Sequence, residues 1–264
     1  MCCLYDDVGE FRRRLTAFFA AGLRAGCRVA YAGLGGAEES RADLAGVPDV
    51  DRRVADGSVQ ILSLQDVYGD AHPVDRDRVV GFYAAATEQA LADGFRGLRV
   101  GADGSELVRS PAHLDALARY EFLADRYMAG HALSALCGYR LDLGHETVNE
   151  LASLHATGSS GGTGFTLFGC ADGAIGLGGQ YDPTSVTVLR RLLTRIRAGS
   201  DDGTVVIDMA DVEYVDHRLL RTLSAHAREQ GVALSLRSAP PFAARLMELL
   251  GASCLQHAEE GTDT

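Results

Sequence analysis

The sequence predicts an α/β protein of two domains, and three observations support this class. The chain has 264 residues, 47% of them hydrophobic and 23% charged, which is the composition of a folded globular protein. Apolar segments typical of strands alternate with amphipathic segments in the first part, which predicts a parallel sheet covered by helices on both faces. Residues 157–164 are all Gly, Ser or Thr, and this composition predicts a flexible linker. We therefore expect domains at 1–156 and 165–257.

In the first domain, the helical segment 8–25 follows Asp6 and Asp7, either of which can cap its N-terminus, and Gly26 can end it. Its apolar residues recur with the period of a helix that buries one face. Pro111 suits the first turn of a later helix. The expected order is helix 8–25, strand 28–34, helix 38–45, strand 58–64, helix 75–93, strand 98–100, helix 112–129, strand 132–139 and helix 144–155.

In the second domain, Asp172 and Gly173 indicate the turn of a hairpin between two short strands. Residues 204–208 form an apolar run, which predicts a central strand. Asp216 can cap the following helix, and Gly231 can end it. The expected order is strands 165–170 and 174–179, helix 183–196, strand 204–208, helix 217–230, strand 232–236 and helix 242–250.

Charge and motifs exclude several functions. The net charge is −11 and the chain contains 25 Arg and no Lys, so it has neither the basic face that binds nucleic acid nor a phosphate-loop or Schiff-base lysine. No apolar run reaches the length of a membrane span and no signal segment is visible, so we expect a cytoplasmic protein. The six Cys form no CxxC pair, and His145-Glu146 lacks the second His of a zinc protease motif. We therefore expect no metal, no required cofactor and no catalytic residue.

The second domain resembles STAS domains, the fold of anti-sigma-factor antagonists. The resemblance rests on Gly179-Gln-Tyr-Asp182, Val205-Val-Ile-Asp208 and Val212-Glu-Tyr-Val-Asp216. It implies an anti-sigma factor or another STAS-binding regulator as partner, bound through Asp216, His217, Arg218 and Arg221. In that family a kinase phosphorylates a Ser at the start of this helix. Arg218 stands at that position, so we expect the phosphorylation switch to be absent.

The first domain is similar to the MEDS sensory domains of methanogen, methylotroph and actinobacterial proteins. The residues that carry this similarity include Cys2-Cys-Leu-Tyr-Asp-Asp7, Gly97-Leu-Arg99, Ala135-Leu-Cys-Gly-Tyr139 and His155. In that family a His usually precedes the Cys aligned with Cys2, and no such residue stands in this sequence. The similarity implies a degenerate phosphate-loop fold related to the KaiC and RecA ATPases. Asp6 and Asp7 stand where a triphosphate would bind, so we expect no ATP hydrolysis there.

The sequence predicts a site for a small organic ligand or a redox signal in the first domain. Open parallel sheets bind ligands at the carboxyl ends of their strands, where we place Arg99, Cys137 and Tyr139. Glu121 is expected to pair with Arg99. The candidate ligand-binding residues are Cys2, Tyr5, Asp6, Arg99, Glu121, Cys137, Tyr139 and His155. The chain is thus expected to be a non-enzymatic signalling regulator, with a homodimer as one assembly. The alternatives are an enzyme or nucleotide-binding protein that uses this crevice, and a scaffold.

Overall fold

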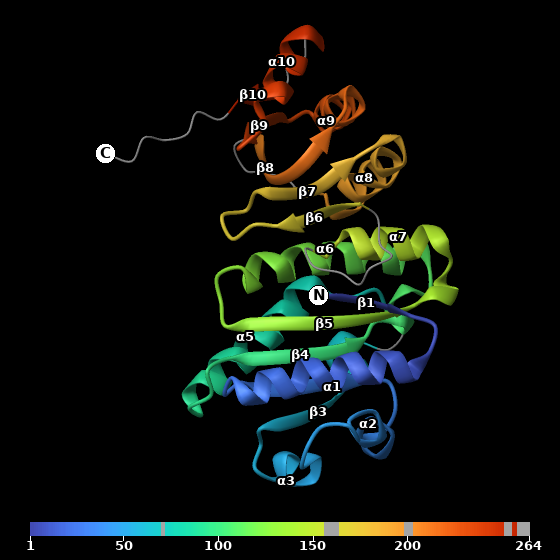
Figure 1. Ribbon diagram of the computed structural model, residues 1–264, viewed down its shortest axis with the longest axis vertical. Coiled ribbons are helices and arrows are strands. Elements are labelled where there is room, and N and C mark those ends of the chain that lie inside the picture. Colours follow the sequence, from blue (N-terminus) through green and yellow to red (C-terminus); the bar gives the residue numbers. More distant parts are fainter. Residues whose placement is uncertain (70–71, 156–163, 198–202, 251–254, 258–264) are drawn as a thin grey trace.

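The computed structural model describes residues 1–69, 72–155, 164–197, 203–250 and 255–257, and it contains two separate sheets (Figure 1). The expected linker 157–164 lies outside the described residues except for Gly164. Within the described part of the chain, no helix combines the length and the apolar character that crossing a membrane requires.

The first sheet is parallel throughout, as the alternating pattern predicts, with strand order β1-β5-β4-β2-β3. Its strands are β1 (Cys2–Tyr5), β2 (Arg28–Gly33), β3 (Val59–Ser63), β4 (Leu98–Asp103) and β5 (Leu133–Arg140). Its helices are α1 (Val8–Arg24), α2 (Ala37–Asp43), α3 (Val50–Ala55), α4 (Leu64–Tyr68), α5 (Arg76–Ala92), α6 (Pro111–Met128) and α7 (His145–Ser153), with short 3₁₀ turns at Ser105–Val108 and Leu141–Leu143.

In most strands of the first sheet, alternate residues enter two different hydrophobic cores, because successive side chains of a strand point to opposite faces of a sheet. One core lies against α1 and α2, and it contains Cys3, Tyr5 and Leu136. The other lies against α4, α5, α6 and α7, and it contains Cys2 and Cys137. Residues that are neighbours in a strand therefore lie on opposite faces of the sheet. Only candidate residues on the same face can contact one another.

The second sheet is mixed, with strand order β10-β9-β8-β7-β6. Its strands are β6 (Phe165–Gly169), β7 (Ile175–Tyr181), β8 (Thr204–Val215), β9 (Ala233–Arg237) and β10 (Leu255–His257), and its helices are α8 (Pro183–Ile196), α9 (His217–Gln230) and α10 (Pro241–Leu250). The β6–β7 hairpin is antiparallel and the other pairs are parallel. β8 is the central strand, as the sequence predicts.

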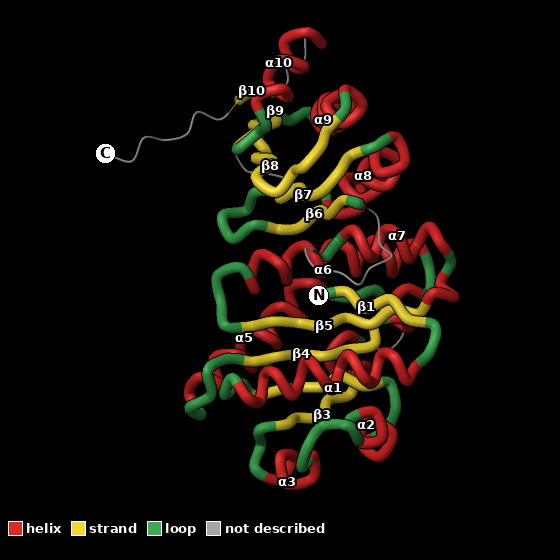
Figure 2. The backbone as a smooth tube through the Cα atoms, viewed as in Figure 1, coloured by secondary structure: helices red, strands yellow, loops and turns green. Residues whose placement is uncertain are grey.

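Most expected elements are present, and the differences have local causes (Figure 2). Sequence patterning did not predict β1, β10, α3 or α4, which are too short to show a period. β8 continues seven residues past the expected end at Asp208. Its apolar half pairs with both β7 and β9, whereas its second half pairs with β7 alone. The second half therefore tolerates exposed acidic residues, and these hide its strand character in the sequence.

The caps agree with the sequence. Asp7 accepts a hydrogen bond from the Gly9 N–H at 2.9 Å and caps α1. Asp216 accepts hydrogen bonds from the backbone N–H groups of Arg218 and Leu219 and caps α9. The Asp7 carboxylate thus lies at the N-terminus of α1, where the helix dipole favours a negative charge.

α6 lies between the two sheets and contacts both domains (Figure 1). Leu117 and Tyr120 of α6 belong to the core of the first sheet. Ala118 and Phe122 of the same helix belong to the core of the second sheet, where they join residues of β6 and α8. Because these two sets lie on different sides of one helix, a displacement of α6 changes the packing of both domains.

Candidate functional site

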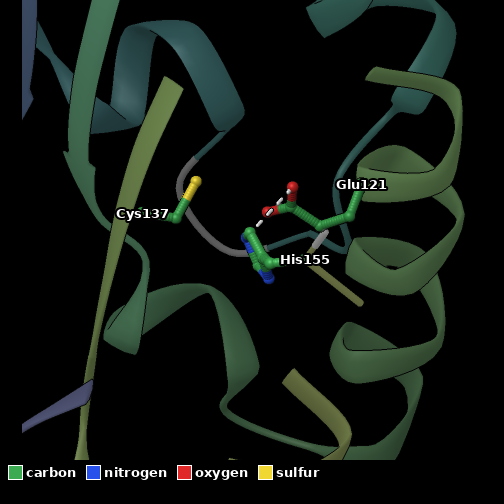
Figure 3. A group of neighbouring side chains, drawn as sticks. All are labelled: Glu121, Cys137 and His155. Atoms are coloured by element: carbon green, nitrogen blue, oxygen red, sulfur yellow. Dashed lines mark ion pairs between the residues drawn. The ribbon is translucent and has the colours of Figure 1, made fainter. Parts of the chain in front are cut away.

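Four of the eight candidate residues form a buried cluster between β5, α6 and the segment after α7. Figure 3 shows three of them, Glu121, Cys137 and His155. Glu121 comes from α6, and both Cys137 and Tyr139 come from β5 on the face toward α6. His155 follows α7. The four side chains are at most 8% exposed. A carboxylate, a thiol, an imidazole and a phenol therefore meet in a nearly water-free interior.

Hydrogen bonds orient this cluster. The Tyr139 hydroxyl donates to Glu121 Oε1 at 2.9 Å. His155 Nδ1 lies 2.8 Å from the Leu151 carbonyl oxygen, so Nδ1 carries the proton that it donates there. His155 Nε2 lies 3.6 Å from Glu121 Oε2, which is beyond hydrogen-bond distance. The lone pair of Nε2 thus points toward the carboxylate and the thiol.

Burial determines the protonation states. It lowers the pKa of His155, so the imidazole is neutral, with Glu121 opposing the shift. Burial also raises the pKa of the Cys137 thiol well above its usual value, and the Glu121 carboxylate adds to this increase. Burial raises the pKa of Cys2, which pairs in register with Cys137 on β1, to about 12. Neither cysteine is a free thiolate, so neither is a ready nucleophile.

A cavity of about 20 Å³ adjoins the cluster and is lined in part by Glu121 and Cys137. Three tyrosines also line it, and their hydroxyls bond to one another, since the Tyr68 hydroxyl lies 3.3 Å from that of Tyr120 and 3.2 Å from that of Tyr83. The lining is therefore almost entirely apolar. A cavity needs about 10–15 Å³ to hold one water molecule. The space therefore has room for a water-sized molecule and not for a nucleotide.

Cys2 lies beside the cluster, next to Cys137, but three other predicted site residues do not reach it. Tyr5 lies on the opposite face of the sheet, where its hydroxyl donates to Asp103, and Asp6 is exposed. The expected pairing of Arg99 with Glu121 is wrong. Arg99 is the second residue of β4, far from its carboxyl end, and its side chain points toward α1. Its guanidinium donates to the Phe18 carbonyl oxygen at 3.1 Å and stacks over the Phe18 ring.

Sequence reasoning missed Asp125, which lies one turn after Glu121 on α6. Burial raises its pKa well above the usual value, and the Gly169 N–H of β6 donates to its carboxylate. A second acidic residue four positions after Glu121 in a largely apolar helix was the available signal, since positions i and i+4 share a helix face. Asp125 links the helix of the buried cluster directly to the first strand of the second domain.

A charged contact also joins the two domains. Glu150 of α7 has a side chain only 3% exposed, and its two carboxylate oxygens lie 2.6 Å from Arg191 Nε and 2.6 Å from Arg195 Nε on α8. Arg195 also pairs with Asp115 of α6. The Arg119 Nε–H donates to the Arg195 carbonyl oxygen at 2.9 Å. α6 and α7 thus hold α8 through paired and buried charges.

The candidate partner-binding residues lie together at the start of α9. His217, Arg218 and Arg221 are exposed, and Asp216 is the N-cap. The Arg218 guanidinium lies 3.0 Å from Asp216 Oδ2, so the cation at this helix start is paired with an acidic residue. The pair offsets the unfavourable placement of a cation at a helix N-terminus.

Comparison with known protein families identifies a family for each of the two domains. The family model described as "MEDS: MEthanogen/methylotroph, DcmR Sensory domain" matches residues 1–156, more than half of the chain. The chain belongs to the MEDS family. A second model, described as "Mlab, STAS domain", matches residues 170–256. The protein is therefore a MEDS domain fused to a STAS domain, as the sequence resemblances imply. No curated protein matches the chain significantly.

Both domains are of regulatory types and the combination indicates a signalling regulator of the STAS family. The cluster Glu121, Cys137, Tyr139 and His155 lies in the MEDS domain, and α6 connects it with β6, the edge strand of the second sheet.

Proposed function

We propose that the MEDS domain receives a very small molecule or a redox signal at the buried cluster and controls the STAS domain through α6. The STAS domain then binds an anti-sigma factor or a similar regulator in the cytoplasm and alters transcription. The proposed division is residues 1–156 for sensing, 157–164 for the linker and 165–257 for output. In this proposal the chain has no catalytic residue, and its response is a change in partner affinity.

The observation that carries the proposal is the position of α6. Glu121 on one side of this helix contacts the buried cluster, whereas Phe122 packs in the STAS core and Asp125 accepts the Gly169 N–H. A signal that changes the contacts of Glu121 acts on a rigid element that β6 packs against. A single packed helix that contacts both sites is a physical route by which they could be coupled.

The cavity size limits the signal. About 20 Å³ beside Glu121 and Cys137 admits a water-sized molecule, and the lining is almost entirely apolar because the three tyrosine hydroxyls bond to one another. A nucleotide or a haem would require α5 and α6 to separate. We therefore favour a small inorganic species or a small redox-active molecule over the larger ligands that the fold class commonly binds.

The proposed output surface is the start of α9 at Asp216, His217, Arg218 and Arg221. Arg218 has no hydroxyl to phosphorylate and carries a fixed positive charge at an exposed position. Partner binding there would be controlled by the MEDS domain instead of by a kinase. The surface is cationic apart from Asp216, so it suits an acidic patch on the partner.

We expect Arg218→Glu to weaken partner binding at least about tenfold, because it puts an anion against the acidic patch of the partner. Titration calorimetry with the anti-sigma factors of the source organism measures this change. Arg228→Glu is the matched control, since Arg228 is exposed in the last turn of the same helix. Equal affinity for the wild type and Arg218→Glu would remove this surface from the proposal.

A further inference from the structure

We infer that Glu121, Cys137 and His155 form a binding site for one Zn²⁺ ion. The sensory role of this ion rests on the proposed function, whereas the binding site itself is inferred from the positions of the side chains. One carboxylate oxygen, one sulfur and one imidazole nitrogen all lie within 4.8 Å of one another (Figure 3). Ligand atoms of one zinc ion, at about 2.0–2.3 Å from the metal, lie within such distances of each other.

His155 provides the observation that points to a ligand. It is 4% exposed, and its Nε2 atom has no hydrogen-bond partner among the described residues. A buried polar atom without a partner is costly in an apolar interior. Its Nδ1–H donates to the Leu151 carbonyl, so Nε2 presents its lone pair to the cluster. Metal-binding histidines are held in this way, with the second ring nitrogen donating to a carbonyl or a carboxylate.

Glu121 is oriented in the same manner. Its Oε1 accepts the Tyr139 hydroxyl at 2.9 Å, which leaves Oε2 directed toward His155 Nε2. The 3.6 Å between these two atoms is too long for a hydrogen bond and leaves room for a shared ion. Tyr139 is therefore a positioning residue that acts on zinc through Glu121.

The charges balance when the ion is bound. Zinc forms a bond with the Cys137 sulfur, the S–H bond breaks, and the proton leaves to solvent. A carboxylate and a thiolate then neutralise the two positive charges of Zn²⁺, and the neutral imidazole adds none. A neutral site is what a buried position requires, and sulfur, nitrogen and oxygen ligands together favour zinc over magnesium or calcium.

Three protein ligands leave the fourth tetrahedral position of zinc to an exogenous ligand. The cavity lined by Glu121 and Cys137 has room for a water molecule or a species of similar size. An exchangeable fourth position would let the MEDS domain detect a small metal-binding molecule. The three protein ligands come from α6, β5 and the end of α7, and this separation in the chain explains why the sequence shows no zinc motif.

The test uses the full chain, stripped with a chelator and then dialysed against Zn²⁺. We expect about one zinc per chain by elemental analysis and a rise in Tm of about 5 °C or more at saturating metal. Cobalt substitution should give a thiolate-to-cobalt charge-transfer band. Less than about 0.1 zinc per wild-type chain, or zinc binding without the cobalt–thiolate band, would overturn the inference.

Variants assign the ligands. Cys137→Ala and His155→Asn should each lower zinc affinity at least about 100-fold, and Tyr139→Phe about tenfold. Asparagine keeps a donor for the Leu151 carbonyl, so His155→Asn is the variant chosen to preserve the fold. Cys27→Ser and His113→Asn are controls because neither residue belongs to the cluster. Equal zinc affinity in all variants would contradict the inference, and the cobalt spectrum of the wild type decides the matter if a variant fails to fold.

The zinc site and the proposed function can be disproved independently of each other. Absence of zinc binding leaves the partner affinity of Arg218→Glu as an independent test. Loss of the partner effect leaves the metal content unchanged, because the start of α9 contributes no ligand to the cluster.

Discussion

Replacing Glu150 with alanine should lower the free energy of unfolding by about 2–4 kcal/mol, because the change leaves two arginines without their buried partner. The Glu150 carboxylate is 3% exposed and lies 2.6 Å from both Arg191 and Arg195. Arg191 and Arg195 are 32% and 19% exposed, so water can recover part of the loss, and we expect less than the full cost of breaking a fully buried pair.

Glu146→Ala is the matched control for this prediction. Glu146 lies one turn before Glu150 on α7 and pairs with the same Arg191 at 3.7 Å, but its side chain is 82% exposed. An exposed pair of this kind contributes little, so the control should change the free energy of unfolding by less than about 0.5 kcal/mol. Urea unfolding of the full chain compares the two variants. Equal effects would show that burial of Glu150 does not stabilise the contact between α7 and α8.

Gly169→Ala should destabilise the chain by about 1–3 kcal/mol through overpacking between the two domains. A Cβ atom at Gly169 would overlap the Phe122 carbonyl oxygen of α6 and would also meet the Arg126 side chain. The carbonyl oxygen is backbone and cannot rotate away, so β6 must move from α6. This displacement would also weaken the hydrogen bond that the Gly169 N–H donates to Asp125.

Gly164→Ala is the control for Gly169→Ala, because a Cβ atom at Gly164 would meet no atom of the described residues within 4 Å. We expect the control to unfold at the same urea concentration as the wild type. A Gly169→Ala variant as stable as this control would show that β6 does not pack tightly against α6.

The sequence predicts the class and order of most elements because the apolar periods are long and the caps are clear. Asp7, Gly26, Asp216 and Gly231 each stand at the helix end where the sequence places them. The fusion of a MEDS and a STAS domain was also predictable, since its motifs are local in the sequence. Short elements such as α4 and the polar half of β8 were not, because packing and pairing determine them.

The candidate site was predictable in part. Glu121, Cys137, Tyr139 and His155 were singled out from sequence and do meet in the structure. Tyr5 and Arg99 were assigned to the same crevice, but they lie on the opposite face of the sheet from Cys137. A shift of one residue along a strand reverses the face, and only the register of the sheet fixes this. The contacts of α6 with β6 and α8 depend on the arrangement of two domains, which no local pattern encodes.

The most direct test of coupling through α6 is a double-mutant cycle between Tyr139→Phe and Gly169→Ala, measured as free energies of unfolding of the full chain. Tyr139 contacts α6 at Glu121, and Gly169 contacts it at Phe122 and Asp125. A control cycle replaces Tyr139→Phe with Tyr31→Phe, which removes a hydrogen bond to Asp43 on the opposite face of the first sheet.

If α6 transmits changes between the buried cluster and the STAS domain, the Tyr139–Gly169 pair should deviate from additivity by at least about 0.8 kcal/mol while the Tyr31–Gly169 pair adds within about 0.3–0.5 kcal/mol. Additive effects in both cycles would contradict a sensory role for the cluster that acts through this helix.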